Sequence, residues 1–215
     1  MWENCDKSNY ESHKKNGLGQ ICHDGFYNDI KSYASNTDFK TFLEIGTWNG
    51  LGSTKAFSEG FKNRDDDYIF YSLECNKDKW GDAVKLYDDN RIHILNEVIW
   101  NEEPSNFYEI FPQCLTSETF KHWNEVDIIN MKKCDIFLNR PNLPEVFDVL
   151  LLDGGEFTTY YEFQLLKNRC NILMLDDINV DKCKLIVEEI KNDPTWEIIK
   201  TENIRNGYLI AKKIN

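Results

Sequence analysis

Acidic side chains directly follow several short apolar runs of this sequence. Glu74 and Asp153 each follow one such run, and Asp176-Asp177 follows a third. Carboxylates accept hydrogen bonds from hydroxyl groups, bind divalent cations through oxygen, and take up protons as general bases. Carboxylates gathered at one edge of a sheet would therefore suit a hydroxyl-bearing ligand and the activation of a hydroxyl group.

A glycine-rich turn follows the first apolar run, within residues 43–54 (LEIGTWNGLGST). Gly46 and Gly50 allow the backbone to turn sharply and to approach a ligand without interference from a β-carbon. Ser53 or Thr54 is expected to cap the helix that follows. The spacing is E-x-G-x-x-x-G, which differs from the G-x-G-x-x-G of dinucleotide-binding proteins. A tight strand-to-helix turn without a ligand remains the alternative interpretation.

The elements that position these residues are predicted from the apolar pattern. Near-continuous apolar runs indicate strands buried on both faces, as in a parallel sheet. These runs are Thr41–Ile45, Tyr68–Leu73, Arg91–Leu95, Val146–Leu152 and Asn171–Leu175. Helical patterns lie between them at Ser53–Phe61, Lys77–Leu86, Thr158–Lys167 and Asp181–Asn192. This alternation predicts an α/β fold in which helices cover both faces of a doubly wound, mostly parallel sheet.

Two further runs predict an antiparallel C-terminal hairpin. Trp196–Lys200 and Tyr208–Ala211 flank Asn206-Gly207, a strong turn signal. With the five earlier runs they give a sheet of about seven strands. At 215 residues, the chain suits a single domain spanning 1–215.

Two segments lie outside the predicted sheet. Residues 1–38 include an amphipathic helical pattern near Ile21–Tyr33, and residues 99–145 form an aromatic-rich insertion between the third and fourth strands. A connection as long as the insertion needs secondary structure of its own or a functional reason. We expect both segments to cover the acceptor side of the ligand site.

Composition excludes several classes of partner. The formal net charge of −12 opposes binding to bulk nucleic acid and to anionic membranes. No apolar run approaches the roughly 18 residues of a membrane span, and the first residues lack a signal-peptide stretch. The seven cysteines have irregular spacings without C-x-x-C, which favours free thiols in a reducing compartment. We therefore expect a cytoplasmic protein, and assembly into a homo-oligomer stays open.

The glycine turn and the carboxylate at Glu74 together resemble the class I S-adenosylmethionine-dependent methyltransferases. The segment Glu44–Thr54 looks most like the small O-methyltransferases of the macrocin (sugar) and catechol types. The resemblance implies a Rossmann-like fold, S-adenosylmethionine as cofactor, and methyl transfer to an oxygen. One departure is Gly52, where the family often has a serine. The implied cofactor-binding residues are Glu44, Gly46, Thr47, Trp48, Asn49, Gly50 and Ser53 near methionine, Glu74 at the ribose, Asn96 and Glu97 at adenine, and Asp153.

The same resemblance implies a magnesium site. Asp153, Asp176 and Asp177 would hold Mg²⁺, and a hydroxyl group bound to that cation would lose its proton more readily. Sugar-modifying members often carry D-x-D after the fourth strand, whereas Gly155 stands at the second acidic position here. Alternatively, the two later aspartates cap the next helix and only Asp153 faces the ligand. Asp153 is the first candidate for the general base and Glu156 the second.

The acceptor is expected to be a small molecule or a glycan. The aromatic residues of the insertion could stack on sugar rings, which favours a sugar hydroxyl and a role in glycan modification. A phenolic or other small acceptor, a methyltransferase-like binding module without turnover, and a nicotinamide-dependent oxidoreductase remain the alternatives.

Overall fold

The computed structural model describes residues 19–112 and 116–214. A seven-stranded sheet forms the centre of this part of the chain. Its strands are β1 (Thr41–Ile45), β2 (Ile69–Leu73), β3 (Ile92–Leu95), β6 (Phe147–Leu152), β7 (Cys170–Asp176), β8 (Trp196–Glu202) and β9 (Tyr208–Lys213). Their order is β3-β2-β1-β6-β7-β9-β8. None of the described helices is long and apolar enough to cross a membrane.

The sheet is mostly parallel, as predicted. β1 pairs in parallel with β2 on one side and with β6 on the other. β9 runs antiparallel to both of its neighbours, β7 and β8, which it separates. The chain moves outward in one direction from β1 to β3 and in the other from β6 to β7. Ligands of open α/β sheets bind at such a reversal, beyond the carboxyl ends of the strands.

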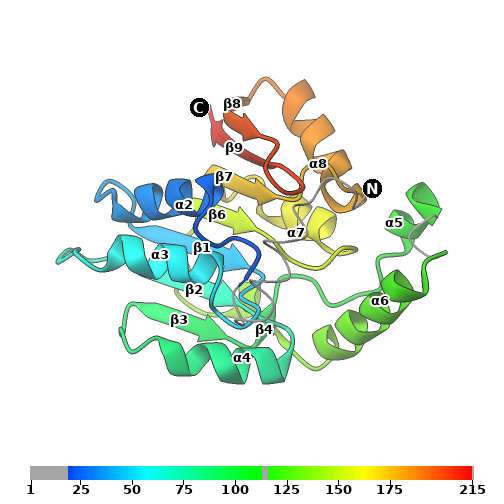
Figure 1. The fold of residues 1–215 in the computed structure, drawn as a ribbon, viewed down its shortest axis with the longest axis horizontal. Helices are drawn as coiled ribbons and strands as arrows, with labels where there is room; N and C mark the ends of the chain where they lie inside the picture. The colour runs from blue at the N-terminus through cyan, green and yellow to red at the C-terminus, as the bar shows by residue number, and fades with distance from the viewer. Residues whose placement is uncertain (1–18, 113–115, 215) are drawn as a thin grey trace.

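Helices cover both faces of the sheet (Figure 1). On one face lie α2 (Gly25–Ser35) and α3 (Ser53–Phe61), and on the other lie α7 (Thr159–Leu166) and α8 (Asp181–Asn192). Successive strand residues point to opposite faces, so Phe42 packs with α2 and α3 while Leu43 packs with α7 and α8. Both residues are fully buried, which explains why the strand sequence is apolar without alternation.

The cap of α3 and the start of α2 differ from the sequence-based prediction. Gly52 occupies the N-cap position of α3, and no side chain caps that helix. The prediction of a Ser53 or Thr54 cap is therefore wrong; the Thr54 hydroxyl donates to Glu44 instead. The amphipathic helix near Ile21–Tyr33 begins four residues later than its first predicted residue, because Asp24 caps it by accepting a hydrogen bond from a backbone N–H of its first turn.

The helix predicted at Lys77–Leu86 is split into α4 (Lys77–Ala83) and a 3₁₀ turn, η1 (Val84–Leu86). The insertion has secondary structure of its own. It contains α5 (Ser105–Ile110), α6 (Glu118–Met131), β5 (Asp135–Ile136) and η3 (Phe137–Asn139). β5 forms a two-residue parallel ladder with β4 (Glu97–Val98), which directly precedes the insertion. Figure 1 shows α5 and α6 on the side toward which the parallel strands point.

Candidate active site

A cavity of about 450 Å³ lies at the carboxyl ends of the parallel strands, within the usual size range of small-molecule sites. Its wall brings together residues from β1, β2, β7 and the segment after β6 with residues of α6, α7 and α8. The predicted site residues in this wall are Gly46, Thr47, Trp48, Ser53, Glu74, Glu97, Asp153, Glu156, Asp176 and Asp177. The glycine turn and Glu74 thus converge on one cavity, as the resemblance requires.

The turn after β1 depends on Gly46. Its φ of +102° is a backbone conformation that side chains disfavour. A β-carbon here would lie 2.1 Å from the carbonyl oxygen of Asp153, so a side chain has no room. The backbone N–H groups of Gly46 and Thr47 both donate to the carbonyl of Leu73, at 3.0 and 3.1 Å. The turn is therefore tied to the ends of β2 and β6, where the other polar site residues begin.

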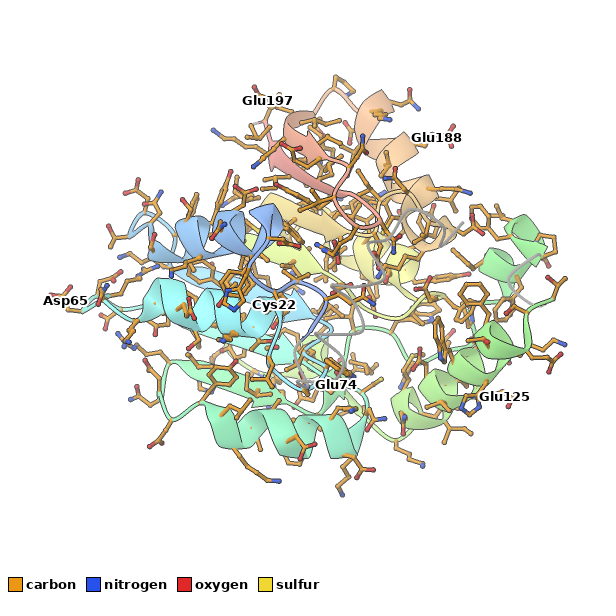
Figure 2. All side chains as sticks on the ribbon, viewed as in Figure 1. Cys22, Asp65, Glu74, Glu125, Glu188 and Glu197 are labelled. Carbon is orange, nitrogen blue, oxygen red and sulfur yellow. The ribbon has the colours of Figure 1, made fainter. Side chains whose placement is uncertain are left out.

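Glu74 lies between the glycine turn and α4, and Figure 2 labels it near the middle of the view. One carboxylate oxygen accepts from the backbone N–H of Trp48 at 2.6 Å, and the other accepts from Asn76 at 2.8 Å. Only 9% of Glu74 is exposed. Burial raises the pKa of Glu74 to about 7, although the two backbone donors oppose this shift. Each oxygen keeps a lone pair for a hydroxyl group in the cavity.

Four predicted cofactor-binding residues lie outside the cavity wall. Glu44 is completely buried, and its carboxylate accepts from the hydroxyls of Thr54 at 2.7 Å and Ser72 at 2.5 Å. Asn96 donates through its amide to the carbonyls of the residues at 74 and 75, at 2.7 and 3.1 Å. Asn49 accepts from a backbone N–H within the turn, and Gly50 gives that turn a second positive φ, +78°. These residues stabilise the segments that form the wall but do not line the cavity themselves.

The three aspartates of the predicted metal site do come together. One oxygen from each of Asp153, Asp176 and Asp177 lies within 4.8 Å of the others. The ammonium group of Lys182 lies among them, 3.1 Å from Asp153 Oδ1 and 2.9 Å from Asp177 Oδ2. Burial lowers the pKa of Lys182, but the carboxylates of Asp177, Asp153 and Glu156 raise it more, so the lysine stays charged.

The other oxygens of Asp176 and Asp177 also have partners. Arg205 donates to both oxygens of Asp176 at 2.9 Å, and Asn206 donates to Asp177 Oδ1 at 3.0 Å. The N-cap of α8 is Val180, so the alternative in which the two later aspartates cap that helix is wrong. A divalent cation would need oxygens that already bind cationic side chains. As arranged here, the residues present therefore do not fit Mg²⁺.

Three further carboxylates extend the acidic wall. The cavity is lined by Asp127 of α6, by Glu156 just before α7, and by Glu162 of α7. Burial raises the pKa of each, to about 6 for Asp127 and to about 7 for Glu162. Oε2 of Glu162 is buried and has no hydrogen-bond partner among the described residues. Such an oxygen is costly unless a ligand donates to it, so this wall suits a ligand rich in donors.

Residues on both predicted covering segments reach the cavity. Residues 19–21, just before α2, lie in its wall, and Gly19 packs against Gly52 at the start of α3. Within the insertion, α6 contributes Asp127 and Met131. The part of the N-terminal segment formed by residues 1–18 lies outside the described residues.

The aromatic residues of the insertion mainly pack on one another. Phe107 and Phe157 form a small core with several of them, and Trp100 stacks on Tyr161 with 4.8 Å between ring centroids. None of the insertion's described aromatic residues belongs to the cavity wall. Stacking of these rings on a sugar therefore has no support in the arrangement of the described residues.

Three solved structures share this architecture over most of their length. A candidate caffeoyl-CoA O-methyltransferase from Staphylococcus aureus has a TM-score of 0.59 and 16% identity, covering 98% of this chain and 93% of that one. An O-methyltransferase from Bacillus cereus in complex with S-adenosylhomocysteine has a TM-score of 0.60 and 12% identity, covering 96% and 89%. The chain has the fold of class I O-methyltransferases.

The third methyltransferase is TomG from Streptomyces achromogenes, involved in tomaymycin synthesis and solved with S-adenosylmethionine. Its TM-score is 0.58 at 11% identity, covering 95% of this chain and 87% of that one. No protein-family model and no curated protein matches the sequence. The likeness therefore rests on structure, and it confirms the predicted Rossmann-like methyltransferase fold.

Several residues that line the cavity were not predicted from the sequence. Asp127 and Glu162 lie on helices, and their sequence neighbourhoods carry no motif. Lys182 offered a weak signal, because a lysine in the first turn of a helix opposes the helix dipole and therefore needs a local reason. That reason is the pair of aspartates it contacts.

Proposed function

We propose that this protein is an S-adenosylmethionine-dependent O-methyltransferase acting on a small, hydroxyl-rich acceptor. The observation that carries the proposal is the convergence of the Gly46 turn and Glu74 on one cavity, joined by the 2.6 Å hydrogen bond from Trp48 to Glu74. A turn that brings backbone close to a ligand and a carboxylate that accepts from vicinal hydroxyls suit an adenosine-bearing molecule. The fold shared with O-methyltransferases supports the same assignment.

We infer the orientation of the cofactor from the wall. The ribose hydroxyls would donate to Glu74. The methionine carboxylate would lie at the start of α3, where no side chain caps the helix and Ser53 lines the cavity. Free N–H groups and the helix dipole favour an anion there. Adenine would lie by Glu97, which Arg140 holds with hydrogen bonds of 2.6–2.8 Å.

The reaction would be an in-line displacement. A lone pair of the acceptor oxygen forms the new carbon–oxygen bond, the carbon–sulfur bond breaks, and its electron pair stays on sulfur as S-adenosylhomocysteine leaves. Asp153 Oδ2 would take the hydroxyl proton, because Lys182 occupies Oδ1, and Glu156 is the second candidate for this role. Positioning of the two reactants in a site that excludes water would supply most of the rate enhancement.

We propose a sugar hydroxyl as the acceptor, in a glycan or a smaller sugar. The support is the acidic wall of Asp127, Glu156 and Glu162, because carboxylates accept hydrogen bonds from neighbouring hydroxyl groups. We further propose the cytoplasm as the compartment, since the described cysteines, five in number, are free thiols. An oligomer of identical subunits stays a prediction that gel filtration with light scattering would test.

The test begins with binding. Titration calorimetry with S-adenosylhomocysteine should give saturable binding, whereas NAD should give none. Transfer of a labelled methyl group is then measured against sugars, catechols and amines, with the product's methylated atom located by mass spectrometry. Binding of NAD in place of S-adenosylhomocysteine would refute the proposal. Cofactor binding without transfer to any acceptor would instead favour the non-catalytic binding module.

A further inference from the structure

Lys182 has an unusual environment for a lysine. It is 3% exposed and lies in the first turn of α8, where the helix dipole disfavours a positive charge. A buried ammonium group is costly unless it is paired and hydrogen-bonded. Here Asp153 and Asp177, at the ends of two neighbouring strands, supply that pairing. Lys182 therefore belongs to the acidic cluster as its cation.

The space between the aspartates accommodates one cation. Their facing oxygens lie within 4.8 Å of one another, and Lys182 Nζ contacts two of them at 2.9 and 3.1 Å. A magnesium ion would bind the same oxygens at about 2.0–2.1 Å. It would lie so near the ammonium group that the two positive charges would repel each other strongly. Binding of a divalent cation thus requires Lys182 to leave.

The charges of the cluster are already compensated. Lys182 is shared by Asp153 and Asp177, and Arg205 binds Asp176 through both of its oxygens. Among the six oxygens of the three aspartates, only Asp153 Oδ2 is left without a donor from the described residues. That oxygen is on the aspartate that our proposed function assigns as the base.

We propose that the ammonium group of Lys182 replaces a divalent cation in this site, and that methyl transfer by this protein needs no metal. The inference rests on the proposed function for its catalytic part. Lys182 is a positioning residue: by binding Asp153 Oδ1 and neutralising the neighbouring Asp177, it leaves Asp153 Oδ2 to accept the proton of the acceptor hydroxyl. A single positive charge replaces the two that magnesium would bring.

The experiment measures metal binding directly. Mn²⁺, a paramagnetic substitute for Mg²⁺, is titrated into the full-length protein and free Mn²⁺ is followed by electron paramagnetic resonance. We expect no binding to the wild type at submillimolar Mn²⁺. K182M removes the charge but keeps most of the side-chain volume, and we expect it to bind Mn²⁺ at least about tenfold more tightly than the wild type. K182R, which keeps a positive charge, should behave like the wild type.

The matched control is K184M. Lys184 lies on the same helix, is exposed, and pairs with Asp181 outside the cluster, so its loss should not create a Mn²⁺ site. If K182M fails to fold, as judged by its thermal melt, the wild-type titration still decides. Submillimolar Mn²⁺ binding by the wild type would overturn the proposal, and so would loss of methyl transfer in EDTA that Mg²⁺ restores. Failure to find an acceptor would weaken the proposed function but would leave the Mn²⁺ result unaffected.

Discussion

Replacement of Glu74 by glutamine tests whether this carboxylate binds the cofactor. Ionised Glu74 would accept two ribose hydroxyls, and hydrogen bonds to a charged group contribute roughly 1.5–3 kcal/mol each. The amide of glutamine keeps one accepting oxygen and places a donor against the N–H of either Trp48 or Asn76. Loss of one charged bond should weaken S-adenosylhomocysteine binding by about 10–150-fold at pH 8.

The pH dependence of binding gives a sharper test. The pKa of Glu74 is about 7, so its ionised fraction is nearly complete at pH 8 and small at pH 5.5. If only the ionised form binds, affinity at pH 5.5 should be lower by about 30-fold, because the apparent affinity scales with the competent fraction. Calorimetric titrations from pH 5.5 to 8 measure this change. In E74Q the component due to Glu74 should disappear.

The control for that experiment is E162Q. Glu162 has a pKa of about 7 in the same cavity, but it lies on α7 rather than at the proposed ribose position. E162Q should keep the pH dependence that E74Q loses, and the ligand-free melting temperatures of both variants show whether they are folded. A wild-type affinity that is constant from pH 5.5 to 8, or equal affinity in wild type and E74Q at pH 8, would refute the assignment of Glu74.

Three other predictions concern the turn, the base and the buried carboxylates. G46A should lower the free energy of unfolding in urea by more than about 2 kcal/mol, because its β-carbon would collide with Asp153, whereas G81A, with open space around it, should change it little. D153N should slow methyl transfer by about 10²–10⁴-fold in single-turnover assays while weakening S-adenosylhomocysteine binding much less; equal losses in both would contradict its role as base. The pKa of Glu162 is about 7 in the folded protein and 4.5 in the unfolded chain. Its protonation therefore stabilises the fold fully at pH values below 4.5, and this contribution is lost as the pH rises through about 7. Between pH 5 and pH 8, the free energy of unfolding of E162Q should therefore decrease less than that of wild type, by at most about 3 kcal/mol. An equal decrease in both proteins would show that Glu162 ionises normally.

The central sheet could be predicted because its strands are buried on both faces. β1 begins and ends at the predicted residues, since Thr41–Ile45 is bounded by a polar segment and a glycine turn. The predicted bounds of α3 and α8 also agree with the structure. The insertion could only be predicted as a structured segment, because α6 buries just Asn124 and Met131 and follows no clear apolar stripe.

The site could be predicted at the strand ends and not beyond them. Glu74 and Asp153 directly follow parallel strands and Asp176 ends another, so chain topology alone brings them to one edge. Asp127 reaches the cavity only through the docking of α6, which local sequence does not encode. The resemblance also implied a cofactor contact for Glu44, but its hydroxyl partners Ser72 and Thr54 turn it inward.

The position of β9 affects how this protein is assembled during translation. β8 leaves the ribosome before β9, yet β9 lies between β7 and β8, so β8 has no place in the sheet until β9 has been made. Arg205, the counter-charge of Asp176, precedes β9 in the connecting loop. A nascent chain that stops short of this loop would present Asp176 without its counter-charge and an open edge on β7. Both features expose it to misfolding and aggregation until synthesis of β9 is complete.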